Sequence, residues 1–138
     1  MKTINGLTLK EMIISGANNL FNCYPEVDAL NVFPVPDGDT GTNMNLTMSS
    51  GAKEIANRND NNVYDIARAF SKGLLMGARG NSGVILSQFF RGIYTGMESI
   101  KGSSATVGEF IDCLVSGYKV AYKAVMKPIE GTILTVMR

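Results

Sequence analysis

The stretch Leu30-Asn-Val-Phe-Pro-Val-Pro-Asp-Gly-Asp-Thr-Gly-Thr-Asn-Met-Asn45 decides the fold class of this 138-residue chain. Its first half is the one extended apolar run in the sequence. Pro34 and Pro36 exclude that run from a central β-strand, because proline cannot donate to the hydrogen-bond ladder. Period-two alternation is not sustained anywhere else. The sequence therefore predicts an all-α fold of antiparallel helices joined by short loops.

Apolar residues recur at helical spacing on both sides of this stretch. A first helix is expected over residues 8–22, closed by Pro25, which removes a backbone donor. Later stripes predict helices through residues 44–55, 63–74, 85–93 and 107–125. The last of these begins with a capping box formed by Thr106 and Glu109. A further helix is expected to open near Glu130, and we expect more helices beyond Arg138.

Length and composition indicate one domain over residues 1–138 with no internal boundary. Thirteen basic and twelve acidic residues give a net charge of +1, which provides no general attraction to nucleic acid or to anionic membranes. No apolar run reaches the roughly 18 residues of a membrane-spanning helix. The chain is expected to be soluble, with no nucleic-acid partner and no membrane span.

The cysteine and histidine contents limit the chemistry. Cys23 and Cys113 have no zinc-like spacing, so reduced thiols in a cytoplasmic protein are expected. Histidine is absent, which removes the usual general base at neutral pH and the commonest zinc ligand. Catalysis must therefore use carboxylates, hydroxyls or metals.

Asp37-Gly-Asp39 is the first candidate site. Two carboxylates separated by glycine in a non-helical loop can project to one side, and a hard cation such as Mg²⁺ removes their mutual repulsion. The loop leads into a helix whose first N–H groups, near Thr42, Asn43 and Met44, are expected to be unpaired and suited to phosphate. An ordinary surface turn is the alternative.

Two other known kinds of acidic-loop site have characteristic residue spacings that can be compared with this loop. An EF-hand requires an oxygen ligand at loop position five and a glutamate at position twelve, where this chain has Gly41 and Met48. A hydrolase of the haloacid dehalogenase type would place its first aspartate after a buried strand, which the prolines disfavour. The first is excluded, and the second stays a weaker alternative.

A second loop, Gly77-Ala-Arg-Gly-Asn-Ser-Gly83, also leads into an expected helix. It offers backbone donors, the Ser82 hydroxyl and the Arg79 guanidinium, and could hold a polyphosphate from the other side. It lacks the Gly-Lys-Ser/Thr ending of a Walker A loop, and a tight turn between helices is the alternative.

Together, the stretch from Leu30 to Asn45 and the stretch Lys72-Gly-Leu-Leu-Met-Gly-Ala-Arg-Gly-Asn-Ser-Gly-Val-Ile-Leu-Ser-Gln88 resemble the nucleotide-binding domain of the dihydroxyacetone kinase L-subunit (DhaL) family. The closest branch is the bacterial fatty acid kinase, FakA-type. The resemblance implies an antiparallel up-and-down barrel of eight helices, of which this chain would hold roughly the first six. It also implies ATP or ADP as cofactor, with two Mg²⁺ ions held by an aspartate cluster.

The resemblance also implies roles for individual residues. Asp37 and Asp39 match two metal-binding, catalytic aspartates, and Asn31 stands near the third metal position. Glu130 falls near a later motif and becomes a candidate catalytic residue. The candidate nucleotide-binding residues are Thr40, Gly41, Thr42, Asn43, Arg79, Gly80, Asn81, Ser82 and Gly83.

Thr40 stands where dihydroxyacetone kinases tend to have histidine, which favours the fatty acid branch. That branch implies phosphorylation of a fatty acid carboxylate to an acyl phosphate, with the lipid presented by a DegV-like binding protein. The alternatives are an L-type subunit of a dihydroxyacetone kinase and a non-catalytic nucleotide-binding or interaction module. Apolar faces left uncovered in this chain predict self-association, so a homo-oligomer is a further expectation.

Overall fold

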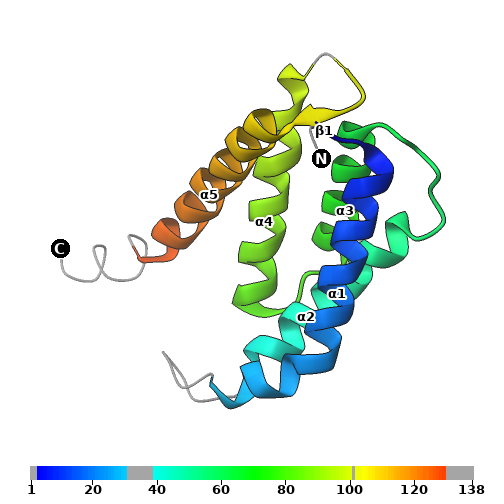
Figure 1. Cartoon of the computed structure of the whole chain (residues 1–138). Helices are drawn as coiled ribbons and strands as arrows, with labels where there is room; N and C mark the ends of the chain where they lie inside the picture. The colour runs from blue at the N-terminus through cyan, green and yellow to red at the C-terminus, as the bar shows by residue number, and fades with distance from the viewer. Residues whose placement is uncertain (1–2, 31–38, 101, 130–138) are drawn as a thin grey trace.

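The computed structural model describes residues 3–30, 39–100 and 102–129, with the backbone alone at 127–129. The described chain is almost entirely helical (Figure 1), which confirms the all-α prediction. Its helices are α1 (Gly6–Ala29), α2 (Thr40–Ile55), α3 (Val63–Gly77), α4 (Gly80–Gly96), the short 3-10 helix η1 (Met97–Ser99) and α5 (Val107–Ile129). The helix expected near Glu130 lies outside the described residues.

Two short strands join the start of α1 to the start of α5. β1 (Thr3–Ile4) pairs antiparallel with β2 (Ala105–Thr106). The inward residues Ile4 and Ala105 are buried and belong to the hydrophobic core. A pairing of two residues is too short to leave a period-two pattern, so the sequence did not predict it.

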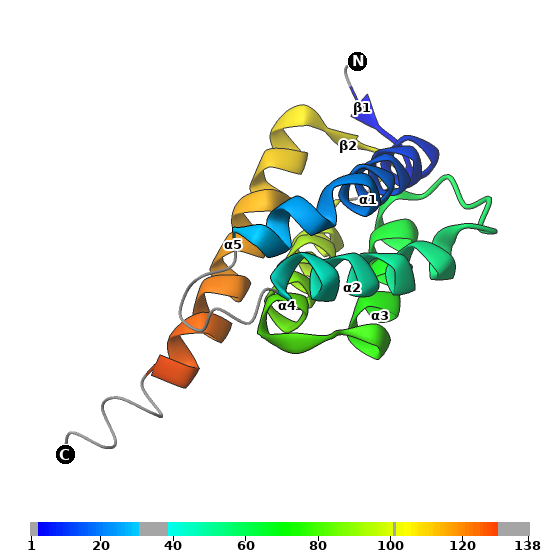
Figure 2. The same cartoon turned by 90° about the horizontal axis from the view of Figure 1, so that it is seen from below.

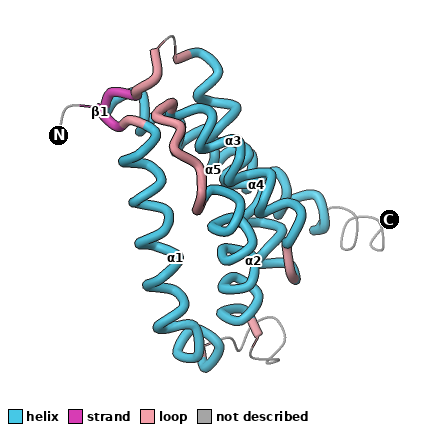
Figure 3. Tube along the Cα trace, turned by 90° about the vertical axis from the view of Figure 1, so that its right-hand side faces the viewer, coloured by secondary structure: helices cyan, strands magenta, loops and turns pink. Residues whose placement is uncertain are grey.

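Consecutive helices pack against each other and run in opposite directions (Figures 1 and 2). α1 extends from the β1 end of the molecule to the opposite end, where α2 and α4 begin (Figure 3). Two helix N-termini from different parts of the sequence therefore share one end of the molecule. We call this end the site end.

The centre of the core is the predicted apolar stripe of α3. Phe70 and Leu74 are fully buried. The Phe70 ring meets Phe90 of α4 edge to face, with 4.8 Å between ring centroids. On the other side, Gly51 of α2 lets the Phe70 and Leu74 side chains approach its backbone so closely that an added Cβ would lie 2.6 Å from Phe70. α3 therefore holds α2 and α4 in fixed positions.

The first helix is longer than the sequence predicts. It continues through Pro25 to Ala29 instead of ending at residue 22. Proline removes the hydrogen bond to the carbonyl four residues earlier, that of Phe21. Figure 2 shows the last turns of α1 bent away from its first turns, as a proline inside a helix produces. Contacts with α2, described below, hold these last turns helical.

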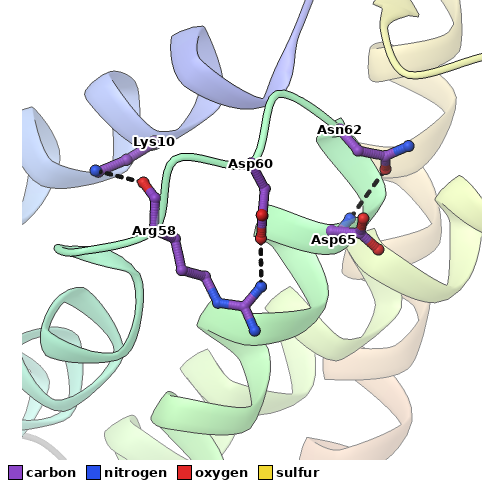
Figure 4. A network of polar contacts seen from close by, with 5 residues as sticks. All are labelled: Lys10, Arg58, Asp60, Asn62 and Asp65. Atoms are coloured by element: carbon purple, nitrogen blue, oxygen red, sulfur yellow. Dashed lines mark hydrogen bonds and ion pairs between the residues drawn. The ribbon is translucent and has the colours of Figure 1, made fainter.

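A polar network holds the connection between α2 and α3 against α1, away from the site end (Figure 4). Lys10 Nζ donates to the Arg58 carbonyl at 2.8 Å, and Arg58 pairs with Asp60 at 2.5 Å. Asn62 caps α3 by accepting from the Asp65 N–H at 3.1 Å. The ion pair is exposed and contributes little stability, so the cap and the backbone contact are the structural elements here.

The predicted apolar stripe of α5 divides into two faces. Phe110, Cys113 and Leu114 pack on the core. A second row is exposed to between 45% and 61% and forms what we call the α5 outer face: Val107, Ile111, Val115, Tyr118 and Tyr122. α5 therefore presents apolar side chains on two sides, and α4 covers only one of them.

Candidate nucleotide site

The two sequence-predicted loops meet at the site end. α2 begins after its N-cap residue Asp39, and α4 begins after its N-cap residue Arg79. The Ser82 hydroxyl reaches the Thr40 carbonyl at 3.5 Å. The structure thus brings together two groups of candidate residues about forty positions apart in the sequence, Thr40–Asn43 and Arg79–Gly83, each at a helix N-terminus where the partial positive charge favours anions.

A buried threonine links the starts of the two helices. Thr47 Oγ1 donates to the Asn43 carbonyl at 2.8 Å and accepts from the Arg79 N–H at 3.0 Å. Thr47 is completely buried. Thr47 was not predicted as a site residue, because a threonine on a helical stripe carries no signal that distinguishes a linking hydroxyl from a packed side chain. Thr47 fixes where the loop before α4 sits on α2.

Glycine is required where α4 begins. Gly80 has φ of +68°, the only positive φ among the described residues, in the left-handed region that favours glycine. A Cβ at this position would lie 2.4 Å from Nδ2 of Asn43. The Asn43 amide therefore lies directly on the backbone of the second loop. The helix starts at Gly80 instead of near residue 85, so Gly80–Gly83 form its first turn.

Asp28, at the end of α1, binds the first turn of α2 and was not predicted from the sequence as a site residue. The Thr42 N–H donates to Asp28 Oδ1 at 2.8 Å, and the Thr42 hydroxyl donates to Oδ2 at 2.5 Å. These bonds lower the pKa of the Asp28 carboxyl, with the Thr42 hydroxyl as the largest cause and the N–H groups of Thr42 and Gly41 assisting against the effect of burial. No sequence pattern connects Asp28 to a helix that starts twelve residues later.

This contact corrects one expectation about α2. The N–H groups of Thr42 and Asn43 were expected to be unpaired, but Thr42 donates to Asp28 and Asn43 donates to the Asp39 carbonyl at 2.8 Å. The expectation was wrong for Thr42 because helix α1 extends past Pro25 and carries a carboxylate to this turn. It was wrong for Asn43 because its N–H makes the first backbone bond of α2. Any phosphate at α2 must therefore be met by other groups.

Comparison with known protein families identifies the family of this chain. The DAK2 domain family matches residues 34–138, which is most of the chain and includes both loops. The chain belongs to the DAK2 domain family. DAK2 domains bind the nucleotide in dihydroxyacetone kinase. The FakA-type branch stays an expectation from the sequence.

Similar proteins match nearly the whole of this chain. Protein YloV of Bacillus subtilis is 57% identical over 138 residues, which is 100% of this chain and 25% of that protein. An uncharacterized protein of Staphylococcus epidermidis is 58% identical over 135 residues, 98% of this chain and 24% of that protein. One of Staphylococcus aureus is 56% identical over the same shares. The chain thus spans about a quarter of the length of these relatives.

The candidate metal-binding residues of this DAK2 domain lie only partly among the described residues. Asp39 is an exposed residue at the start of α2. Asp37, Asn31 and Glu130 lie outside the described residues. Within the residues that the structure describes, no group of three acidic, histidine or cysteine side chains is placed to hold a metal. The Mg²⁺-binding role of Asp39 therefore stays a prediction.

The groups around Asp39 fit a magnesium–nucleotide complex. Ser82, Asn43 and Asp39 supply hydroxyl, amide and carboxylate oxygens, the hard ligands and hydrogen-bonding groups that Mg²⁺ and phosphates require. Arg79 and Asn81 are exposed beside them, while Gly41 and Gly83 are buried in the helix starts. Asn45, one turn beyond Gly41, is 8% exposed, and its Oδ1 accepts no hydrogen bond from the described residues. The site end thus carries polar groups in a partly buried setting.

In the described part of the chain, no helix is long and apolar enough to cross a bilayer.

Proposed function

We propose that this DAK2 domain binds ATP with Mg²⁺ and transfers its γ-phosphoryl group. The observation that carries the proposal is the meeting of the α2 and α4 starts, through Ser82 with Thr40 and Asn43 with Gly80. Phosphoryl transfer requires positioning and charge stabilisation more than covalent chemistry from the protein. Two adjacent helix N-termini with hydroxyl, amide and guanidinium groups meet that requirement.

Each part of the site has a role in this proposal. The α4 start, with the Ser82 hydroxyl and the Arg79 guanidinium, binds phosphate oxygens. Asn43 orients them from α2. Asp39 and Asp37 hold the cations, with Asn31 as a further oxygen ligand. When bound, Mg²⁺ supplies positive charge against the β- and γ-phosphates. Glu130, like Asp37 and Asn31, stays a prediction outside the described residues.

The acceptor that we propose is a fatty acid carboxylate, giving an acyl phosphate. A carboxylate is already ionised near pH 7, so its oxygen can attack the γ-phosphorus without a general base. This agrees with a chain that has no histidine. The acceptor would be presented by a DegV-like fatty-acid-binding protein, and the reaction would take place in the cytoplasm, where ATP is available.

Nucleotide binding is tested by calorimetric titration of ADP with Mg²⁺ into the wild-type chain and into Asp37→Ala/Asp39→Ala. We expect at least tenfold weaker binding by the double variant, because two metal-binding carboxylates are lost. Asp60→Ala is the matched control, since Asp60 is an exposed aspartate in the network away from the site. Circular dichroism must show equal helix content in all three. Equal affinities of the wild type and the double variant would refute the metal assignment.

The acceptor is tested separately. ATP consumption is compared with a fatty-acid-loaded DegV-like protein and with the triose-carrying subunit of a dihydroxyacetone kinase. Turnover with the first alone supports the fatty acid kinase. Turnover with the second alone would support the L-type subunit instead. Nucleotide binding with turnover on neither would favour the non-catalytic module.

A further inference from the structure

Two aspartates compete for the first turn of α2. Asp39 is the N-cap residue, the position from which an aspartate side chain ordinarily accepts a hydrogen bond from the second or third helical N–H. Those N–H groups belong to Gly41 and Thr42. Asp39 makes no such capping bond, and its ψ of 4° is outside the extended region that capping residues use. The Thr42 N–H bonds instead to Asp28 Oδ1 at 2.8 Å.

Asp28 is held in this place by the packing of α1 on α2. Gly41 lies so close to the last turns of α1 that an added Cβ would be 2.2 Å from the Tyr24 carbonyl oxygen and 2.9 Å from Cβ of Val27. The Thr42 hydroxyl also donates to Asp28, at 2.5 Å. Asp28 thus receives hydrogen bonds from both the N–H and the hydroxyl of Thr42. The cap of α2 comes from the preceding helix.

We propose that Asp28 is a positioning residue that caps α2 in place of Asp39 and thereby leaves the Asp39 carboxylate to a divalent cation. The inference rests on the proposed function, which places the cation at Asp39. A carboxylate that caps its own helix turns its oxygens toward the helix N–H groups. A carboxylate that makes no capping bond can turn its oxygens outward, toward a cation. Groups that orient metal ligands from behind commonly change metal affinity by 10- to 100-fold when removed.

The alternative for Asp28 is a purely structural bond between α1 and α2, or a general contribution of negative charge. Two substitutions distinguish these roles. In Asp28→Ala the cap is lost, and Asp39 can turn back to the N–H groups of Gly41 and Thr42. In Asp28→Asn the side-chain oxygen can still accept from Thr42, because asparagine caps helices about as well as aspartate. The charge, however, is lost in both variants.

The experiment titrates Mn²⁺, as a probe for Mg²⁺, into each variant without nucleotide and measures free Mn²⁺ by electron paramagnetic resonance. We expect Asp28→Ala to weaken Mn²⁺ binding about tenfold or more, approaching an Asp39→Asn reference. Asp28→Asn is expected to stay within about threefold of wild type, since the cap persists. Helix content and thermal melting are measured in parallel. If the alanine variant does not fold, a loss of Mn²⁺ affinity in the folded asparagine variant still contradicts the capping role.

Three results would overturn the inference. Unchanged Mn²⁺ affinity in both variants would leave Asp28 a structural contact only. Equal weakening in both would show that its charge, and not its cap, matters. Absence of Mn²⁺ binding by the wild type would remove the cation from Asp39. Calorimetry with ADP and Mg²⁺ on the same wild-type sample then shows whether the proposed nucleotide binding fails as well.

Discussion

The backbone conformation and the surroundings of Gly80 favour glycine at this position of the site end. Its φ of +68° and the 2.4 Å between its notional Cβ and the Asn43 amide exclude any side chain without a shift. The glycine-rich composition of the loop was visible in the sequence. The contact with Asn43, thirty-seven positions earlier in the chain, was not, because it depends on the parallel placement of α2 and α4.

Replacing Gly80 with alanine is expected to weaken ADP binding at least tenfold. Alanine in the left-handed region costs about 1–2 kcal/mol, and the Asn43 side chain must also move away from the α4 start. Calorimetric titration of ADP with Mg²⁺ measures the effect.

Gly16→Ala is the matched control for this substitution. A Cβ at Gly16 meets no heavy atom within 4 Å, and Gly16 lies inside α1. It is expected to leave ADP binding unchanged and to raise the free energy of unfolding by about 0.5–1 kcal/mol, since alanine favours helix over glycine. Similar ADP affinities in Gly80→Ala and wild type would contradict the role of this turn.

Asp39 and Ser82 could be selected from the sequence, because carboxylates and hydroxyls beside glycine at helix starts have a recognisable chemistry. Asp28 and Thr47 could not. Each acts across space on another helix, and neither stands in a pattern that reveals its partner. The described structure therefore adds the supporting residues of the candidate site, while the metal-binding roles of Asp37 and Asn31 stay predictions.

At the scale of elements, hydrophobic periodicity predicted the middle of every described α-helix but not all of the ends. α2, α3 and α5 match the expected stripes because each buries one apolar face. The predicted end of α1 was wrong, because packing against Gly41 and the bonds to Asp28 outweigh the hydrogen bond lost at Pro25. Local propensity sets a helix boundary only where tertiary contacts do not intervene.

The start of α5 is an element whose sequence signal was confirmed. The Glu109 N–H donates to Thr106 Oγ1 at 3.1 Å, and the Thr106 N–H donates to Glu109 Oε1 at 2.9 Å. Thr106→Ala is expected to lower the free energy of unfolding by about 1 kcal/mol, because the Glu109 N–H loses its acceptor. Urea denaturation followed by circular dichroism gives the value.

Glu109→Gln tests the same capping box from the other side. Glutamine also completes a capping box, so this variant is expected to stay close to wild type. A loss in Glu109→Gln as large as in Thr106→Ala would show that charge, and not the reciprocal bonds, stabilises the helix start.

At the scale of the whole molecule, apolar surface remains uncovered around α5. Its outer face is exposed, and an apolar cavity of about 300 Å³ lies among residues of α1, α4 and α5, with Ile13, Phe89 and Leu114 in its lining. Exposed apolar rows of this kind favour association. We therefore expect the 138-residue chain to form a dimer or larger species through the α5 outer face.

Replacing Ile111 and Tyr118 together with glutamate is expected to shift the chain to monomer, since charge on an apolar contact opposes its burial. Light scattering across a range of protein concentrations measures the change. Lys53→Glu on α2 serves as a control for added negative charge away from α5. Monomeric wild type at every concentration would contradict the expectation.

The two-residue pairing of β1 with β2 has a consequence for the order of folding. It closes a loop that contains α1 to α4, whereas the most extensive helix contacts inside the loop join neighbours in sequence. Closing a long loop has an entropic cost that two strand residues repay only after the enclosed helices have packed. The pairing should accordingly form late in refolding and open first in amide hydrogen exchange. Thr3 and Ile4 therefore join a helix bundle that has already assembled.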